Sequence, residues 1–179
     1  MKKKIVRTQP ASQPFVVRRS GIQGVGGFAV RQIRKGEEII EYAGERISQS
    51  EGDRRYDDKP HTYLFEVSSR TLIDGAVDGN DARFINHSCR PNCESVLQRG
   101  RIHIQALRRI RTGEELTFDY SLPRDKSLGA AEDEIYPCRC GARICRGTIL
   151  EPMPRPRRRK RKSQRVKPSA GPPRRTSGG

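Results

Sequence analysis

The spacing of apolar residues along the chain is typical of many short strands. Short runs rich in Val, Ile, Leu, Phe and Tyr alternate with glycine-containing or charged turns, and such runs predict strands. We expect strands at residues 27–30, 39–42, 63–67, 71–73, 95–97, 102–107 and 116–120. The runs 95–97 and 102–107 flank Arg99-Gly100-Arg101 and are expected to form a hairpin. The pattern therefore predicts a mainly β domain.

Helical signals are few. Residues 48–57 form the one candidate helix, with Ser48 or Ser50 as its N-cap, and residues 81–85 are expected to form a single turn. We find no internal repeat. The glutamate-rich stretch at residues 132–134 is interpreted either as a contact for a basic peptide or as a solvated loop.

Length and charge separate a body from a tail. The chain has 179 residues, and a body of about 150 residues buries roughly 68–70% of its unfolded surface, enough for a core without disulfides. Of the net charge of +16, residues 151–179 carry +10, from eleven Lys and Arg and one acid. This composition predicts a disordered basic tail. Binding to nucleic acid or chromatin and nuclear import are the two hypotheses for it.

The search for targeting signals and the number and spacing of cysteines further restrict the class of protein. No run approaches the ~18 apolar residues of a membrane span, and no apolar segment follows the basic start, so we expect no Sec signal. Five cysteines cannot all pair. Cys138, Cys140 and Cys145 indicate a structural zinc site in a reducing compartment, and a closed tetrahedral site requires a fourth ligand. Cys89 and Cys93 are both candidates.

Three segments in this order carry a family resemblance: RFINHSCRPNC (residues 83–93), GEELTFDY (113–120) and CRCGARIC (138–145). Together they closely resemble the signature of SET-domain protein lysine methyltransferases with a cysteine-rich post-SET motif. The resemblance covers roughly residues 15–150 and implies small curved sheets around a knot-like core, where GEELTFDY passes beneath the loop carrying RFINHS. It divides the chain into an N-terminal extension (1–14), a SET domain (15–121), a connecting loop with the post-SET zinc motif (122–150) and the tail (151–179).

The resemblance implies an enzyme that transfers a methyl group from S-adenosylmethionine to a lysine side chain. The glycine-rich segment GIQGVGGFA (residues 21–29) lacks the G-x-G-x-x-G fingerprint, so a dinucleotide fold is not supported. The implied cofactor contacts are Gln23, Gly24, Val25, Gly26, Tyr63, Arg83, Asn86 and His87. His87 is expected to serve binding and local structure, because no acidic partner stands at a spacing that would make it a general base.

By the same resemblance Tyr42, Tyr63, Phe65, Phe118 and Tyr120 line a lysine channel. The catalytic set is Tyr120, Tyr42, Phe118 and Phe65. Tyr120 orients the amine, and Phe118, which has no hydroxyl to hold a water, implies di- or trimethyl product.

Deprotonating lysine at pH 7 costs roughly 4.6 kcal/mol. An apolar channel favours the neutral amine, and alignment contributes about 7–11 kcal/mol, so no carboxylate base is required.

The resemblance also assigns Cys89 as the fourth zinc ligand beside Cys138, Cys140 and Cys145, leaving Cys93 as a buried thiol. No cysteine-rich pre-SET segment precedes residue 15, and the insert between Tyr42 and Tyr63 is short. The expected substrate is a histone tail and the expected location the nucleus or chromosomes. The alternatives are a methyltransferase of a non-histone basic protein, a non-enzymatic zinc-stabilised chromatin- or nucleic-acid-binding protein, and a cytoplasmic location or delivery into a host cell.

Overall fold

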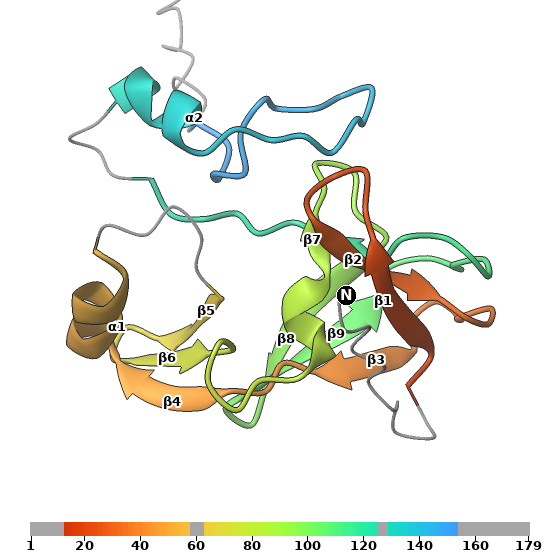
Figure 1. The fold of residues 1–179 in the computed structure, drawn as a ribbon, viewed down its shortest axis with the longest axis horizontal. Helices are drawn as coiled ribbons and strands as arrows, with labels where there is room; N and C mark the ends of the chain where they lie inside the picture. The colour runs from red at the N-terminus through yellow and green to blue at the C-terminus, as the bar shows by residue number, and fades with distance from the viewer. Residues whose placement is uncertain (1–12, 58–62, 125–128, 154–179) are drawn as a thin grey trace, which may run out of the picture.

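The computed structural model describes residues 13–57, 63–124 and 129–153 as small sheets with few helices (Figure 1). The strands are β1 (Phe15–Arg19), β2 (Val25–Ala29), β3 (Glu38–Glu41), β4 (Glu45–Ser48), β5 (Leu64–Ser68), β6 (Thr71–Asp74), β7 (Asn86–His87), β8 (Cys93–Gln98), β9 (Arg101–Ala106) and β10 (Thr117–Phe118). They form the antiparallel sheets β1-β2, β3-β9-β8 and β4-β6-β5, and the parallel pair β10-β7. The predicted mainly β class is confirmed.

The helices are short. They are α1 (Gln49–Tyr56), η1 (Asp81–Phe84), η2 (Gly129–Ala131) and α2 (Glu132–Ile135). Ser48 caps α1 by accepting the backbone N–H of Glu51 at 3.2 Å, as one of the two predicted caps. Within the described part of the chain, no helix has the length and apolar character needed to cross a membrane.

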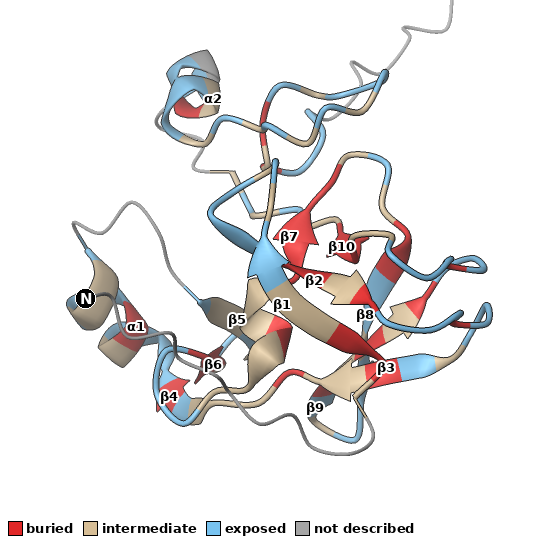
Figure 2. Ribbon diagram, turned by 45° about the vertical axis from the view of Figure 1, so that its right-hand side comes forward, coloured by how far each residue is buried: buried red, intermediate tan, exposed pale blue. Residues whose placement is uncertain are grey.

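One core joins the strands that carry the expected motifs. Its fully buried members include Phe15, Ile33, Ile85, Ile104 and Leu116. They come from β1, β9 and the linking loops. In Figure 2, buried segments are red, and several of them gather near β3, β7 and β10. In Figure 1, α1 and the sheet β4-β6-β5 lie at one end, β1-β2 at the other, and residues 129–153 above β7.

The expected hairpin is confirmed and uses a two-residue turn. Gln98 pairs with Arg101, and the residues between them, Arg99 and Gly100, have φ of 49° and 76°. Two positive φ values in succession match the twist of the flanking strands, which is why glycine stands at the second position.

Two turns with the same sequence pattern meet at the edge of the core. Residues 33–39 read IRKGEEI and residues 110–116 read IRTGEEL. Ile33 and Ile110 exchange backbone hydrogen bonds of 3.0 Å in both directions. In each turn the first glutamate accepts a backbone N–H, Glu37 from Arg34 at 2.9 Å and Glu114 from Arg111 at 3.0 Å. The likeness is confined to one turn in each segment and does not extend to a repeated structural unit.

The pairing of β7 with β10 brings the two central motifs together. Thr117 pairs with Asn86 and Phe118 with His87. The side chain of Asn92 supports this pair, because its Nδ2 donates to the carbonyl of Glu115 at 2.8 Å and its Oδ1 accepts the N–H of Thr117 at 2.8 Å. Segments RFINHSC and GEELTFDY therefore lie side by side.

Candidate functional site

Four aromatic side chains from distant parts of the chain form a row. Ring centroids lie 5.2 Å apart for Tyr42 and Phe65, 6.0 Å for Phe65 and Phe118, and 4.8 Å for Phe118 and Tyr120. These separations are typical of attractive aromatic contacts. Tyr42 follows β3, Phe65 lies on β5, and Phe118 and Tyr120 lie on and after β10. We call these four side chains the aromatic row, and they are the four predicted as the catalytic set.

Both tyrosine hydroxyls of the aromatic row donate to backbone carbonyls. Tyr120 donates to the oxygen of Ile85 at 2.9 Å, and Tyr42 donates to the oxygen of Tyr63 at 2.7 Å. Burial raises the pKa of both phenols above the ordinary tyrosine value. Both therefore stay protonated near pH 7, with the proton directed at a carbonyl, and each oxygen can still accept a hydrogen bond. Neither phenol is placed to act as a base.

Arg83 and Tyr63 border the aromatic row. The Arg83 guanidinium lies 4.8 Å from the Phe84 ring centroid and 5.7 Å from that of Tyr63, while its Nη1 donates to the carbonyl of Gly75 at 2.8 Å. The Tyr63 side chain packs edge-on against Phe84 at 6.3 Å, and the residue is 40% exposed. Arg83 thus braces η1 against the turn that follows β6.

The glycine-rich loop is tied to Asn86. Its Nδ2 donates to the carbonyl of Val25 at 2.9 Å, to that of Gln23 at 3.4 Å, and to Oε1 of Glu115 at 2.9 Å. A Cβ at Gly26 would lie 2.1 Å from the same Oε1 and 2.9 Å from Asn86 Nδ2, so a larger residue there would displace the Glu115 carboxylate. The structure therefore brings the predicted loop residues and Asn86 together. It adds Glu115, which the motif comparison gave no reason to select.

His87 is buried and neutral. Its Nδ1 accepts the backbone N–H of Tyr120 at 3.1 Å, so Nε2 carries the proton and faces Sγ of Cys89 at 3.4 Å. Burial, aided by the nearby charge of Arg146, lowers the pKa of His87 to about 4. The fold does supply an acidic neighbour that the spacing did not reveal, Asp119, whose Oδ1 lies 3.5 Å from Nδ1. The lone pair of Nδ1 is already used, so the two form no acid–base dyad.

Four cysteine sulfurs lie together on the Nε2 side of the His87 ring, opposite the side that contacts Tyr120. The Sγ atoms of Cys89, Cys138, Cys140 and Cys145 all lie within 4.8 Å of one another, and the distances from Cys89 are 3.7 Å to Cys138 and 3.8 Å to Cys145. A tetrahedron with Zn–S bonds of ~2.3 Å has edges of ~3.8 Å. The four sulfurs therefore have the spacing that one zinc ion requires.

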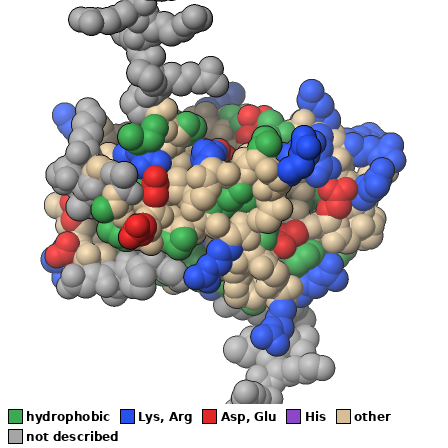
Figure 3. All heavy atoms as spheres, turned by 90° about the horizontal axis from the view of Figure 1, so that it is seen from above, with side chains coloured by type: hydrophobic (Ala, Val, Ile, Leu, Met, Phe, Trp, Pro, Cys, Tyr) green, Lys and Arg blue, Asp and Glu red, His purple; other side chains and the backbone are tan. Residues whose placement is uncertain are grey.

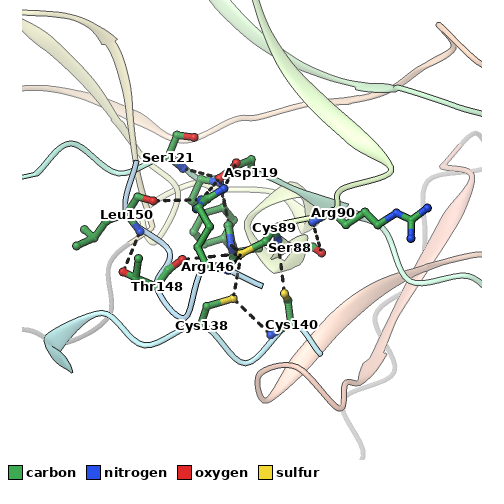
Figure 4. A network of polar contacts seen from close by, with 12 residues as sticks. Ser88, Cys89, Arg90, Asp119, Ser121, Cys138, Cys140, Arg146, Thr148 and Leu150 are labelled. Carbon is green, nitrogen blue, oxygen red and sulfur yellow. Dashed lines mark hydrogen bonds and ion pairs between the residues drawn. The ribbon is translucent and has the colours of Figure 1, made fainter. Parts of the chain in front are cut away.

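The backbone around these sulfurs suits thiolates. Each Sγ accepts at least one backbone N–H, at 3.3–3.5 Å: Cys89 from Arg146, Cys138 from Cys140 and Cys140 from Cys89 (Figure 4), and Cys145 from Gly147. Burial raises the pKa of Cys89 and of Cys138, whereas at Cys140 the N–H groups of Cys89 and Ala142 and the neighbouring thiols outweigh burial and bring the pKa to about 6. Donors of this kind stabilise metal-bound sulfur.

Cys93 has a different environment. It is fully buried, its thiol donates to Oδ1 of Asn92 at 3.3 Å, and burial raises its pKa to about 12. Of the two candidates for the fourth position, the structure places Cys89 with the other three sulfurs and Cys93 in the core.

Comparison with known proteins decides the family. Residues 24–121 match the SET domain. The chain belongs to the SET-domain family. It is 45% identical over 136 residues to histone-lysine N-methyltransferase trithorax of Drosophila virilis, which covers 72% of this chain and 3% of that protein. It is 42% identical over 148 residues to the H3 lysine-4 specific histone-lysine N-methyltransferase of Saccharomyces cerevisiae, covering 76% of this chain and 13% of that protein.

Human histone-lysine N-methyltransferase 2B is 45% identical over 138 residues, which is 73% of this chain and 5% of that protein. The chain thus spans only a small part of the length of these relatives.

One arginine joins the post-SET segment to the SET domain. Arg146 follows the last cysteine of the cluster and binds both carboxylate oxygens of Asp119 at 2.7 Å, while its Nη2 also donates to the carbonyl of Leu150 at 3.1 Å (Figure 4). Asp119 stands between Phe118 and Tyr120. A planar guanidinium with two parallel bonds fixes the orientation of both partners. Sequence reasoning missed Arg146, although its position directly after a metal-ligand candidate was a usable signal.

A second arginine holds the acidic stretch that precedes the post-SET cysteines. Nη2 of Arg124 donates to Oδ1 of Asp133 at 2.8 Å, and its Nε donates to the carbonyl of Glu151 at 2.8 Å. Glu132 is buried, with Oε2 4.0 Å from Nη1 of Arg124. The interpretation of residues 132–134 as a solvated loop was therefore wrong: they begin α2, and two of the three acids face the protein's own arginine.

Proposed function

We propose that this chain is a protein-lysine N-methyltransferase that transfers a methyl group from S-adenosylmethionine to a lysine side chain. The observation that carries the proposal is the aromatic row, which ends at Tyr120 beside Asn86 and His87. Membership of the SET-domain family supports it, as do relatives named as histone-lysine N-methyltransferases.

The residues near the glycine-rich loop fit the proposed cofactor. Gln23, Gly24 and Val25 are exposed, so their backbone is accessible to a ligand. Asn86 uses its Nδ2 for three carbonyl and carboxylate acceptors, and in the described part of the chain no donor reaches its Oδ1. We assign cofactor binding to Gln23, Gly24, Val25, Gly26, Tyr63, Arg83, Asn86 and His87. When bound, S-adenosylmethionine supplies a methyl group on sulfur that is already activated for transfer.

The aromatic row binds the nucleophile, which is the amine of the substrate lysine, and favours its neutral form. A lysine entering an apolar, aromatic site loses hydration, which lowers its pKa and favours the neutral amine. Tyr120, protonated and held by the carbonyl of Ile85, accepts a hydrogen bond from that amine and orients it, and Tyr42 bounds the far end of the row. Phe118 offers no hydroxyl to hold a water, so we propose di- or trimethyl-lysine as product. Cation–π attraction to Phe65 and its neighbours favours the methylated ammonium.

We further propose a structural zinc ion held by Cys89, Cys138, Cys140 and Cys145. Four thiolates close the coordination sphere, so the ion has no open position for substrate or water. Its role is to fix the post-SET segment, and through it Arg146, beside the end of β10.

The proposed substrate is a histone tail, with lysine 4 of histone H3 the first candidate because the yeast relative is named for it. A nuclear or chromosomal location follows from such a substrate. The proposed boundaries place the SET domain at residues 15–121 and the post-SET motif within 122–150. The extension and most of the basic tail lie outside the described residues, and binding of the tail to nucleic acid remains part of the proposal.

Mass spectrometry tests the proposal. The purified chain is incubated with S-adenosylmethionine and either histones H3 and H4 or a total cell lysate, beside its Tyr120→Phe variant. Methylated lysine on histone H3 with wild type and not with the variant is the expected result. Methylation confined to non-histone proteins of the lysate would replace the histone by another substrate. Absence of any transfer, together with absence of cofactor binding by calorimetry, would leave the non-enzymatic chromatin-binding alternative.

A further inference from the structure

Glu115 occupies an unusual position for a glutamate. Its Oε1 accepts the hydroxyl of Ser20 at 2.6 Å and Nδ2 of Asn86 at 2.9 Å. Ser20 in turn accepts the N–H of Ile22 at 2.9 Å, and its own N–H donates to the carbonyl of Gly24. One carboxylate oxygen therefore joins the turn between β1 and β2 to the first residue of β7.

The repeated turns provide an internal comparison. Glu37 and Glu114 do the same structural work, since each accepts the backbone N–H three residues earlier. The second glutamates differ. Glu38 is 53% exposed at its side chain and lies 3.0 Å from Nδ1 of His103, whereas the equivalent Glu115 points at Asn86 and Gly26. The turn itself does not require a glutamate in this orientation.

The contact with Glu115 fixes which end of the Asn86 amide faces which way. An amide NH₂ can donate but cannot accept. Nδ2 is surrounded by three acceptors, the carbonyls of Gln23 and Val25 and Oε1 of Glu115. Turning the amide over would set Oδ1 against all three, which leaves unsatisfied groups and costs roughly the strength of several hydrogen bonds. Oδ1 is thus held as the acceptor available to a ligand.

We propose that Glu115 is a positioning residue of the cofactor pocket. It keeps the Asn86 amide in one orientation and holds the glycine-rich loop against β7, so that the loop backbone and Asn86 Oδ1 form one preorganised surface for the amino-acid portion of the cofactor. The inference rests on the proposed function, because it names how this chain prepares the site for S-adenosylmethionine.

Two conservative substitutions distinguish the effect of the length of the Glu115 side chain from the effect of its charge. Glu115→Gln keeps an oxygen at the same distance and removes the charge, whereas Glu115→Asp keeps the charge and withdraws the carboxylate by one methylene. Calorimetric titration measures the affinity of each variant for S-adenosylmethionine and for S-adenosylhomocysteine. We expect Glu115→Asp to weaken both ligands by about ten- to hundred-fold, the range for a hydrogen bond to a charged group. Glu115→Gln should recover most of the affinity. Zinc content and the circular dichroism spectrum confirm that the variants are folded.

The matched controls are Glu38→Asp and Glu38→Gln, at the equivalent position of the other turn, and both should bind like wild type. Wild-type affinity in Glu115→Asp overturns the inference. So does a Glu115→Gln variant that loses S-adenosylmethionine but not S-adenosylhomocysteine, because Glu115 then acts through its charge on the sulfonium. If the wild-type chain binds neither ligand, the proposed function fails instead, and the two failures are distinguishable.

Discussion

Tyr120 is held from two directions, by its hydroxyl on the carbonyl of Ile85 and by its backbone N–H on Nδ1 of His87. The first bond directs the phenol proton at a carbonyl, and the second ties the position of Tyr120 to a neutral imidazole. A side chain constrained at both ends loses little freedom when a substrate arrives. The chemistry assigned to Tyr120 therefore depends on its exact placement more than on its acidity.

Replacing Tyr120 by Phe tests this placement. The ring stays in the aromatic row while the hydroxyl is lost, so we expect methyl transfer to fall by about 100-fold or more, on the scale of removing one transition-state contact. Affinity for S-adenosylmethionine should stay within about two-fold of wild type. Single-turnover kinetics and calorimetry measure the two quantities. Tyr56→Phe, which removes a hydroxyl bound to Asp74 outside the row, is the control, and equal activity in the two variants would remove Tyr120 from the mechanism.

Phe118 governs the expected product. Its ring is 6% exposed and lies between those of Phe65 and Tyr120. Phe118→Tyr adds a hydroxyl and the water it binds, which fill the space of further methyl groups. Mass spectrometry of a peptide product should shift from di- or trimethyl toward monomethyl lysine. Monomethyl product alone from the wild type would contradict the role given to Phe118.

The aromatic row could be predicted residue by residue, because Phe118 and Tyr120 stand inside the motif GEELTFDY and the family resemblance implied Tyr42 and Phe65. Glu115 could not, and the only sequence signal for Arg146 was its position directly after Cys145. Glu115 differs from Glu38 only in what the fold places opposite it, and nothing in the IRTGEEL pattern distinguishes the two. A contact between residues far apart in sequence has no local signature.

At the scale of elements, the predicted strands and the helix at residues 48–57 correspond to elements of the structure, and three strands, β1, β4 and β7, were missed. β4 (ERIS) contains one apolar residue, Ile47, and is held by its ladder with β6. β1 ends in two arginines, and its pairing with the glycine-rich β2 compensates for weak local preference. Strand propensity depends on such partners, so short strands with few apolar residues escape a sequence pattern.

The zinc cluster gives an element-scale prediction. Cys89→Ser removes one of four sulfurs, so the bound zinc, measured by atomic emission, should fall well below one ion per chain. Cys93→Ser should leave the zinc content unchanged and lower the free energy of unfolding, because a hydroxyl replaces a buried thiol. The opposite pattern would mean that Cys93 is the ligand. Chelation of the wild type should loosen residues 138–150, seen as faster amide exchange.

The pair Arg146 and Asp119 should couple the post-SET segment to β10. A double-mutant cycle with Arg146→Met and Asp119→Asn measures the coupling. Each single change breaks a bidentate, partly buried contact, and we expect an interaction free energy of about 1–3 kcal/mol in thermal or denaturant unfolding. Methyl transfer should fall in both variants while zinc content stays at wild type. Additive losses of stability would show that the two residues act independently.

Charge is unevenly distributed over the whole molecule. Exposed arginines flank the antiparallel pairing of Ile33 with Ile110, among them Arg34 and Arg111. Figure 3 shows basic side chains gathered toward one end of the face it presents. Residues 151–179 add +10 of the total +16. Positive charge thus lies on both the body and the tail, and the proposed binding to nucleic acid would draw on both.

Deleting residues 151–179 separates these contributions. The deletion removes none of the proposed catalytic, cofactor or metal residues, so methylation of a short free peptide should be unchanged. Affinity for duplex DNA should fall, and the slope of its logarithm against that of salt concentration should become shallower, since fewer cations displace counterions. Fluorescence anisotropy over a salt series gives the slope. Loss of peptide turnover on truncation would show that the tail is part of the folded enzyme.

The pairing of Ile33 with Ile110 also sets an order of events during synthesis. Neither turn can satisfy its backbone alone, and β7 has no partner until β10 exists, so the core stays open until the ribosome has passed residue 118. Contacts this distant in sequence slow folding, because the loop must close before any contact stabilises it. Cys138, Cys140 and Cys145 emerge later still. Cys89 therefore stays without its three sulfur neighbours until the 56 residues up to Cys145 have been added, and the proposed zinc site can form only after that point.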